Sequence, residues 1–357
     1  MINRKRARTN LCIVLGLLIP ILLAALRYNV GTDYASYVRQ SVFMDEHNFF
    51  FGRDAFWNVI ANFTMAAGNH AIFVLAFYSS ITVVFFYLAA RKALGKYAWL
   101  AWLLFLCILY PVSLNAVRQL AAVSVAFFVS IYVVRGLING EIVIRRLRTW
   151  VGYILAGVFA VLLHSTALVA LLFAPIYMTV RLIDRGKNRE LYIRAIKTIA
   201  AGVLISAVSI LVVWFMARSI VEIPVFAKYA GIFNREDRMP NILTAVAPAA
   251  VQIFFWRRAA KTTLNKFLLA SGVTYSILII ALSAIIPYGY RIAWYFMPVY
   301  FLQFALIAES FKRNKSIHYK YLAYSFVILW SVGFFILSFY RNGSHDIFPY
   351  QFIFGGL

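Results

Sequence analysis

The sequence predicts an all-α protein, a polytopic transmembrane helical bundle of about eleven spans whose N-terminus lies in the cytoplasm. Three observations predict this fold class. Hydrophobic residues make up 63% of the 357 residues and charged residues only 13%, whereas soluble domains average roughly 45–50% and about 25%. The apolar residues gather in runs of about the length that crosses a bilayer. The basic residues stand in short clusters between those runs.

The apolar runs define the expected spans, which stand at 11–26, 69–90, 97–113, 116–134, 150–163, 166–180, 198–216, 241–256, 267–286, 292–311 and 320–339. Several of them are shorter than the ~20 residues of a straight span. The pair 150–163 and 166–180 fits either two crossings or one re-entrant hairpin, and the orientation of the later spans is the same in both cases. The first run follows a basic segment, as in a signal peptide, but no A-x-A site stands out and further spans follow, so we expect a retained helix.

Charge gives the bundle its orientation. The expected cytoplasmic segments are 1–8, 91–96, 135–148, 181–197, 257–266 and 312–320, and they contain 25 of the 35 lysines and arginines. Cytoplasmic loops carry such an excess of basic residues. We therefore treat 1–357 as a single membrane domain with outer loops at 27–69 and 218–240 and an outer C-terminal tail at 341–357. Within the first loop, the amphipathic stretch 54–67 is expected to be a short helix that lies along the interface or re-enters.

The same features exclude several classes of function. The net charge of +23 is distributed as membrane-orienting clusters, so we expect no nucleic acid partner. The inner loops are too short for a catalytic domain, and the chain has no G-x-x-x-x-G-K-[ST] P-loop and no clear G-x-G-x-x-G motif. We expect no cofactor. Cys12 and Cys107 lie in apolar runs and the outer histidines match no metal motif, so we expect no metal site.

Polar residues gather at the expected outer ends of the spans. Arg27 ends the first span and is followed by Gly31–Tyr34, Arg118 and Gln119 begin the fourth, and Arg291 begins the tenth. Arginine in or near hydrocarbon is costly, so three arginines on the side opposite to the positive-inside preference need a reason. A guanidinium binds phosphate oxygens in a bidentate manner, which suits a pyrophosphate carried on a lipid. The alternative is that each arginine snorkels to the interface or binds an ordinary phospholipid.

Two residues suit proton transfer. His164 lies in the expected outer turn between the fifth and sixth runs, and a histidine pKa near 6.5 suits a general base. The alternative is a helix-end histidine bonded to a carbonyl group. Asp33 is a candidate base or an acceptor for a sugar hydroxyl, or else a turn residue bonded to its own backbone. Aromatic rings also suit sugars, although aromatic belts occur in membrane proteins generally, and the outer segments contain Tyr28, Tyr34, Tyr37, Trp57, Tyr229, Tyr288, Tyr290 and Tyr350.

Several of these segments together resemble the EpsG family of exopolysaccharide proteins, relatives of Wzy-type polymerases. Arg27–Tyr34 with Tyr37 is similar to the family's R-x-x-x-G-T-D-Y-x-x-Y signature, which is the most specific of the motifs. Asn115–Ala121 resembles its R-Q-x-x-A element, and His164–Ala167 resembles its H-x-S-A-type turn, although here Ser and Thr follow the histidine directly. Arg291 and the terminal Pro349-Tyr350 are similar in position and order. The resemblance covers nearly the whole chain.

The resemblance implies a metal-independent polymerase that joins oligosaccharide repeat units carried on undecaprenyl pyrophosphate, at the outer face of the bacterial cytoplasmic membrane. The implied partners are this lipid-linked oligosaccharide, membrane lipids, and a chain-length regulator and a flippase of the same pathway. We expect the catalytic residues to be His164, Asp33 and Arg118. We expect the substrate-binding residues to be Arg27, Tyr34, Tyr37, Gln119, Tyr290, Arg291 and Tyr350.

Three other classes of function share some of these features. A transporter or flippase for lipid-linked glycans would also hold interior arginines, but it would need a cationic cavity open to both faces, whereas the polar residues here favour one face. A ligase that moves finished glycan to another acceptor uses the same chemistry. A multispanning acyltransferase that modifies the glycan would also place a histidine in a membrane setting, and its product would gain an acetyl group rather than length.

Overall fold

The computed structural model describes residues 2–42, 55–65, 70–140, 150–185, 250–285, 290–311 and 317–356, and all regular elements in these ranges are helices. Five helices are long and apolar enough to cross a membrane, at 71–115, 117–138, 263–280, 290–310 and 321–341. Shorter apolar helices occupy 10–25, 151–163 and 165–181. The prediction of an all-α, polytopic membrane protein is therefore confirmed. The expected span at 198–216, most of the one at 241–256 and the loop at 218–240 lie outside the described residues.

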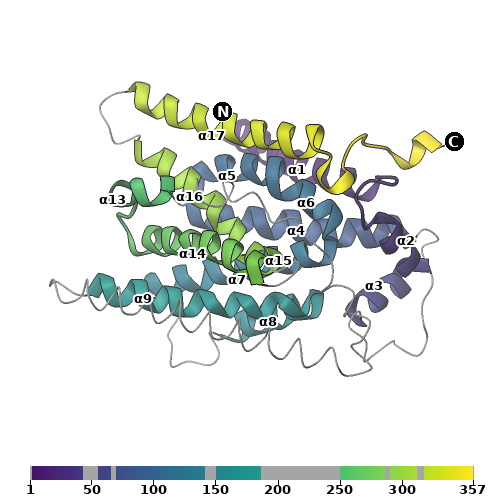
Figure 1. Ribbon diagram of the computed structural model, residues 1–357, viewed down its shortest axis with the longest axis horizontal. Helices are drawn as coiled ribbons and strands as arrows, with labels where there is room; N and C mark the ends of the chain where they lie inside the picture. The colour runs from purple at the N-terminus through teal and green to yellow at the C-terminus, as the bar shows by residue number, and fades with distance from the viewer. Residues whose placement is uncertain are drawn as a thin grey trace.

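The first half of the chain contains α1 (Ile2–Ala25), α2 (Tyr34–Val42), α3 (Ala55–Met65), α4 (His70–Leu94), α5 (Ala98–Leu104), the π-helical η3 (Phe105–Leu109), α6 (Tyr110–Asn115), α7 (Val117–Ile138), α8 (Val151–Leu163), the 3-10 helix η5 (Ser165–Leu172) and α9 (Phe173–Arg185). The second half contains α13 (Trp256–Ala259), α14 (Thr263–Ile285), α15 (Tyr290–Ala293), η7 (Trp294–Phe296), α16 (Met297–Ser310), α17 (Ile317–Phe335), the π-helical η9 (Ile336–Arg341), η10 (Ser344–Asp346) and η11 (Ile353–Gly356). Figure 1 shows the long helices side by side along the length of the molecule.

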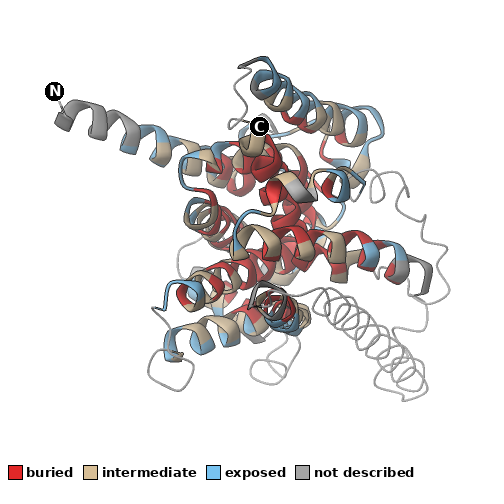
Figure 2. Ribbon diagram, turned by 90° about the vertical axis from the view of Figure 1, so that its left-hand side faces the viewer, coloured by how far each residue is buried: buried red, intermediate tan, exposed pale blue. Residues whose placement is uncertain are grey.

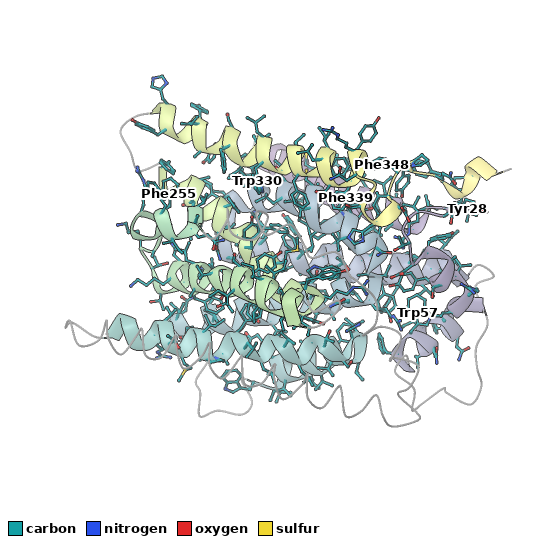
Figure 3. The ribbon with its side chains drawn as sticks, in the orientation of Figure 1. Tyr28, Trp57, Phe255, Trp330, Phe339 and Phe348 are labelled. Atoms are coloured by element: carbon teal, nitrogen blue, oxygen red, sulfur yellow. The ribbon has the colours of Figure 1, made fainter. Side chains whose placement is uncertain are left out.

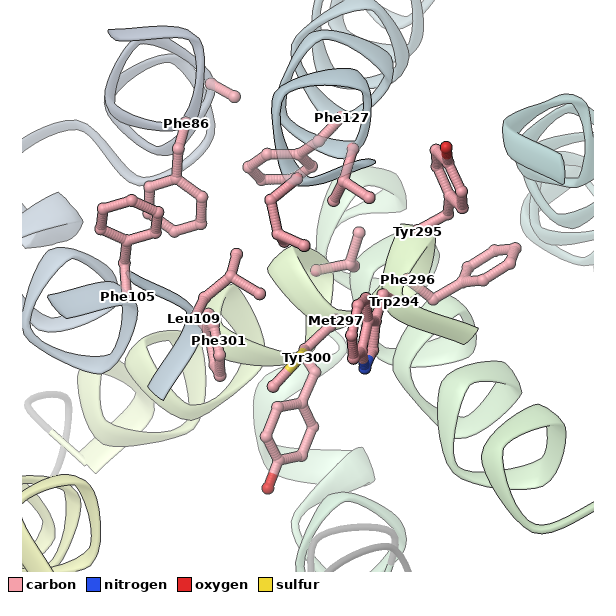
Figure 4. Close-up of a cluster of buried hydrophobic side chains, with 14 of the residues drawn as sticks. Phe86, Phe105, Leu109, Phe127, Trp294, Tyr295, Phe296, Met297, Tyr300 and Phe301 are labelled. Carbon is pink, nitrogen blue, oxygen red and sulfur yellow. The ribbon is translucent and has the colours of Figure 1, made fainter. Parts of the chain in front are cut away.

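The centre of the bundle is an aromatic core shared by α4, η3, α7 and α16. The ring of Phe86 stacks on Phe105 at 4.4 Å and lies 5.6 Å from Phe127 and 6.5 Å from Phe301 (Figure 4). Residues Met297 to Ala308 of α16 are all buried. Aromatic pairs at such distances add about 0.5–1.5 kcal/mol each beyond the area that they bury. These contacts fix the central helices, which in turn position the residues at their ends.

The peripheral helices carry their apolar side chains on the outside. Leu18 of α1, Leu155 of α8 and Leu329 of α17 are 43%, 63% and 72% exposed. Figure 2 shows buried residues where the helices meet and exposed residues on the outward sides of the bundle. In water each exposed Leu would forgo about 1.5–3 kcal/mol of burial energy, whereas hydrocarbon is as apolar as the side chain. The exposed apolar surface is therefore the surface expected to face lipid.

The two runs at 150–163 and 166–180 form two helical limbs that are separated by His164. The backbone of His164 is extended (φ −162°, ψ 122°), which ends α8 and begins η5. Thr166 lies beside Tyr295 near the beginning of α16, whereas the ring of Tyr177 lies 6.3 Å from Phe267 near the beginning of α14. The limb formed by η5 and α9 therefore runs back along the bundle.

The described part of the first loop (27–69) and the C-terminal tail meet at one end of the bundle, on the right in Figure 1. Arg27 and Phe352 form an antiparallel bridge, and the backbone N–H groups of Tyr28 and Ile353 donate to the carbonyls of Gln351 and Leu26, both at 2.9 Å. The expected amphipathic stretch forms α3, which contacts α2, α4 and α8 at the same end. Figure 3 shows Tyr28 and Trp57 at this end as well. We refer to this end as the loop face.

Gly31 allows the first loop to approach the end of α6. Its φ is +95°, and a Cβ atom added there would lie 3.1 Å from the carbonyl oxygen of Leu114. Its N–H donates to the carbonyl of Asp346 in the tail, at 3.0 Å. We expect Gly31→Ala to lower the free energy of unfolding by ~1–3 kcal/mol, because an L residue is strained at this φ. Denaturant unfolding of the detergent-solubilised protein measures this change.

The matched control is Gly16→Ala in α1, where an added methyl group meets no atom within 4 Å. Alanine is the better helix former by about 1 kcal/mol, so this variant is expected to be at least as stable as the wild type. Equal unfolding midpoints for the two variants would contradict the role of Gly31.

Candidate functional site

Polar side chains gather at the loop face where the first loop, the junction of α6 and α7, and the tail meet. We call this set the polar cluster, and it consists of Arg27, Thr32, Asp33, Tyr34, Tyr37, Asn115, Arg118, Gln119, Arg291, His345 and Tyr350. Its members come from segments more than 300 residues apart in the sequence. The packing of the bundle brings them together.

A break between two helices places Asn115 and Arg118. Ala116 adopts φ −96° and ψ 56°, which ends α6 at Asn115 and starts α7 at Val117. Arg118 therefore stands, with Gln119, in the first turn of a helix that is mainly apolar and largely buried. A break inside a buried segment frees backbone groups that need partners. Here the Tyr37 hydroxyl donates to the backbone carbonyl of Asn115, at 2.9 Å.

The Asn115 side chain links the three segments of the cluster. Its Oδ1 accepts a hydrogen bond from the Thr32 hydroxyl at 2.6 Å and another from the Asp33 backbone N–H at 2.9 Å. Its Nδ2 lies 3.2 Å from Nδ1 of His345. Asn115 is only 3% exposed. A buried amide with this many partners is costly to replace, because each partner left behind loses about 1–3 kcal/mol.

Arg27 is a buried guanidinium, 1% exposed, in which Nε and Nη2 have no hydrogen-bond partner among the described residues. Its electrostatic neighbours are the tyrosines Tyr34, Tyr37, Tyr110 and Tyr350, and its Cζ lies 5.9 Å from the centre of the Tyr34 ring. Burial of a charge without paired oxygens costs several kcal/mol. An anion with two oxygens is the kind of ligand that would satisfy these donors.

Arg118 points to the same region from α7. Its Cζ lies 5.4 Å from the centre of the Trp57 ring, and its electrostatic neighbours are Tyr37 and Asp33. Trp57 in turn packs between Tyr37 and Tyr78, with ring centres 5.3 and 5.2 Å away. The stack holds the guanidinium by a cation–π contact. Arg118 is half-buried, so part of it is accessible to a ligand.

Arg291 is positioned through its own backbone. The Gln119 side chain, 6% exposed, donates from Nε2 to the carbonyl of Arg291 at 2.9 Å. The Arg291 guanidinium lies 5.8 Å from the Trp294 ring centre and is an electrostatic neighbour of His345. Gln119 was expected to bind substrate, and in this structure its amide links the first turn of α7 to the start of α15.

A chain of neighbouring residues links the three arginines of the cluster. Arg27 and Arg118 are both close to Tyr37, Arg118 and His345 are both close to Asp33, and Arg291 is close to His345. Among the described residues, Asp33 and Asp346 are the carboxylates that lie near this chain of neighbours, so three arginines outnumber two carboxylates and favour a positive potential in this region. Such a site favours a ligand with more than one negative charge.

The expected tyrosines occupy different positions in this arrangement. Tyr34 lies against Arg27 and also against Tyr28, with ring centres 6.2 Å apart. Tyr37 is buried and bonds to Asn115, and the Tyr350 hydroxyl donates to the carbonyl of Leu23. Tyr290 packs against Trp294 at 5.7 Å. Tyr229 and Tyr288 lie outside the described residues.

His164 lies on the side of the site formed by α8, η5 and η7. Its Nδ1 is 2.7 Å from the Thr166 hydroxyl, which is 3.0 Å from the Tyr295 hydroxyl. Tyr295 follows Arg291 by four positions, so this chain of polar groups approaches the cluster from the α15 side. A side-chain hydroxyl is therefore one partner of the imidazole.

The first loop also forms an open groove beside the cluster. It has a volume of about 400 Å³ and is lined by Tyr28, Asn29, Tyr34, Ala35, Val38 and Arg39. The Tyr34 ring therefore separates the buried Arg27 from a surface groove. Two tyrosines, an amide and a guanidinium offer both an apolar face and polar groups, a combination that suits a sugar.

The chain matches the EpsG family over residues 10–352. It belongs to this family. Searches of curated proteins and of solved structures found no match. Membership in the EpsG family supports a role of the exopolysaccharide-polymerase type, with glycosyltransferase-like chemistry, in a multi-pass membrane protein.

Two residues of this EpsG-family chain were missed by reasoning from the sequence as site residues. Asn115 lies inside the motif that contains Arg118, and its signal in the sequence is that it is an amide within an apolar run. His345 was noted only as an outer histidine without metal spacing, and nothing local in the sequence links it to Asn115. Within the described part of the chain, no three His, Cys, Asp or Glu side chains gather in a way that would hold a metal ion.

Proposed function

We propose that this EpsG-family protein joins oligosaccharide repeat units carried on undecaprenyl pyrophosphate, by glycosyl transfer at the outer face of the bacterial cytoplasmic membrane. The observation that carries the proposal is the buried Arg27, two donors of which have no partner among the described residues, in the same polar cluster as Arg118 and Arg291. A pyrophosphate supplies several negative oxygens, and its lipid tail fits an apolar bundle. The lipid-linked donor binds with its pyrophosphate at the polar cluster.

The reaction transfers the glycan of the donor to a hydroxyl of the acceptor repeat unit. The acceptor oxygen attacks the anomeric carbon, a new C–O bond forms, and the bond between that carbon and the phosphate oxygen breaks. Undecaprenyl pyrophosphate leaves with the electron pair. Arg27, Arg118 and Arg291 stabilise the charge that develops on the leaving group, and stabilisation of this kind often contributes more to the rate than any other effect.

A base takes the proton of the acceptor hydroxyl. His164 and Asp33 are the candidates. Asp33 lies near Arg118 and is held by its backbone N–H, which donates to Asn115 at 2.9 Å. His164 contacts the Thr166 hydroxyl, which in turn contacts the Tyr295 hydroxyl. In this proposal the acceptor hydroxyl faces the anomeric carbon of the donor sugar, which is joined to the pyrophosphate.

The groove supplies a binding surface for the glycan. Tyr28 is 48% exposed and Asn29 has a left-handed backbone with φ 49°. The sugar next to the pyrophosphate would lie over Tyr34, so that binding energy from the glycan helps to align the reacting atoms.

The deciding experiment is a polymerisation assay with the purified protein in detergent and chemically defined undecaprenyl-pyrophosphate-linked repeat units. We expect longer glycans and one undecaprenyl pyrophosphate released for each bond formed. The proposal would be overturned by products that gain only an acetyl group. It would also be overturned if no undecaprenyl pyrophosphate were released. In a deletion strain, repeat units trapped on the inner leaflet would indicate a flippase instead. In the same assay, comparison of His164→Ala with Asp33→Asn identifies the base.

Replacement of Arg27 separates binding from folding. Because two of its donors have no partner in the described part of the chain, Arg27→Met is expected to leave the unfolding temperature unchanged or higher, since removal of a buried charge is often neutral or stabilising. The same variant is expected to lose ~100-fold or more of its polymerising rate. Arg341→Met, at an exposed arginine, is the control. If Arg27→Met instead lowers the unfolding temperature well below that of the wild type, its loss of activity would indicate a structural role for Arg27.

A further inference from the structure

The hydrogen bonds of Asn115 fix the orientation of its amide. A backbone N–H can only donate, and the N–H of Asp33 points to one atom of the amide at 2.9 Å, so that atom is the oxygen. The Thr32 hydroxyl donates to the same oxygen at 2.6 Å. The other amide atom is therefore the nitrogen Nδ2, which has only hydrogens to offer. It faces Nδ1 of His345 at 3.2 Å.

The orientation of this amide determines which nitrogen of His345 carries a proton. Since Asn115 donates to Nδ1, Nδ1 accepts, and the proton of the neutral imidazole is on Nε2. Among the described residues, Nε2 has no hydrogen-bond partner. The ring of His345 also stacks on Phe339, with ring centres 6.3 Å apart, which restricts its rotation. His345 therefore presents an N–H donor from a fixed ring.

The surroundings keep His345 neutral. Burial, and next the positive charge of Arg291, lower its pKa below the usual value of 6.5, against smaller opposing effects of Asp33 and Asp346. These are the charged groups that face it from α15, the first loop and its own segment. A neutral donor can stand next to Arg291 without the repulsion that an imidazolium would meet.

The backbone around His345 is held in an uncommon conformation. Gly343, His345 and Asp346 have φ values of +64°, +66° and +51°. Non-glycine residues in this region are strained, and such positions cluster at functional sites. The segment is held by the bond from the Gly31 N–H to the Asp346 carbonyl and by the buried Ile347, 3% exposed.

We propose that His345 is a substrate-contacting residue that donates its Nε2–H to an oxygen of the lipid-linked pyrophosphate, with Asn115 as the positioning residue that selects this tautomer. The inference rests on the proposed function and adds a fourth donor from the tail to the three arginines. An acceptor that serves both this donor and the neighbouring Arg291 is an anion. His345 thus acts as a hydrogen-bond donor, which leaves proton removal to His164 or Asp33.

Three variants of His345 test the proposal in the polymerisation assay. The amide nitrogen of glutamine reaches the position of Nε2, whereas that of asparagine reaches only the position of Nδ1. We expect His345→Gln to keep the rate within ~10-fold of the wild type, and His345→Asn and His345→Ala to lose ~100-fold or more. Asparagine tolerates a left-handed backbone well, so its loss would not come from the main chain. The proposal would be overturned if His345→Gln and His345→Ala had equal polymerising rates, or if His345→Asn had the rate of the wild type.

Binding provides a readout that does not require the reaction. Undecaprenyl pyrophosphate alone is titrated into the wild type and the same variants, and we expect His345→Ala to weaken binding ~10-fold or more while His345→Gln stays close to the wild type. If the wild type makes no polymer, the proposed function fails. Whatever the result of that assay, binding of undecaprenyl pyrophosphate that is unchanged in His345→Ala overturns the inference about His345. If the variants do not fold, the nitrogen NMR signals of histidine-labelled wild-type protein decide, since a proton on Nδ1 at neutral pH would overturn it.

Discussion

Replacement of Arg118 with alanine is expected to lower the rate of polymer formation by ~100–1,000-fold, the usual cost of removing one preorganised donor from a charged transition state. Arg118 stands in the first turn of α7, close to Asp33 and Tyr37, and its Cζ lies 5.4 Å from the Trp57 ring centre. The loss should appear in both kcat and KM, because the bound pyrophosphate is already charged and gains a further negative charge as the leaving group departs. Rates measured over a range of lipid-linked substrate concentrations separate the two constants.

Lysine at position 118 should recover only part of this loss. A lysine keeps the charge but not the planar fork that binds two oxygens, nor the stacking on Trp57. Arg341→Ala is the matched control, because Arg341 is exposed and stands at the same predicted outer side of the bundle. A rate for Arg118→Ala close to that of this control would remove Arg118 from the mechanism.

Periodicity and charge were sufficient to predict the bundle. Runs of apolar residues give helices because every backbone polar group in hydrocarbon must be satisfied within the chain. The first loop and the tail were predicted to lie on one side, and the structure joins them through the bridge between Arg27 and Phe352. The amphipathic stretch at 54–67 was expected to be a helix, and it is α3. These features depend on local sequence, which is why they could be found in it.

The contacts of the site depend on distant segments and could be predicted only in part. Arg118 and Asp33 were singled out, and the structure brings them together. The position of His345 follows from docking of the tail, which joins residues 230 positions apart and leaves no periodic signal. The same holds for Arg27, whose burial arises from tyrosines of the first loop, α6 and the tail. A motif indicates which residue types are present, whereas their partners are set by tertiary packing.

Replacement of Asn115 with aspartate is expected to reverse the pH dependence that His345 contributes. In the wild type the pKa of His345 is lowered, so the folded state binds fewer protons than the unfolded state. This contribution to stability is complete above the unfolded pKa of about 6.5 and is lost as the pH falls below it. In Asn115→Asp, one carboxylate oxygen still accepts from the Thr32 hydroxyl and the Asp33 N–H. The other carboxylate oxygen now faces Nδ1 of His345 and raises the pKa of His345.

The sign of the effect in the variant follows from that raised pKa. The contribution of His345 to stability is then complete below about pH 6.5 and is lost as the pH rises through the raised value. Thermal unfolding midpoints between pH 5 and 8 measure this, with His345→Gln and the double variant as backgrounds that remove the titrating group. If Asn115→Asp and the wild type respond alike to pH in this comparison, the bond between Asn115 and His345 does not set the tautomer.

The polymerising rate of Asn115→Asp should depend on the protonation state of His345. Above the raised pKa of His345, the aspartate holds the remaining proton on Nδ1, so Nε2 becomes an acceptor and the donor to the pyrophosphate is lost. Below the raised pKa both nitrogens carry protons and the Nε2–H donor returns. The polymerising rate of Asn115→Asp, relative to the wild type at each pH, is therefore expected to rise on acidification, and the double variant with His345→Gln should show no such rise. A relative rate that is flat or falls with acidification would show that His345 does not act through Nε2–H.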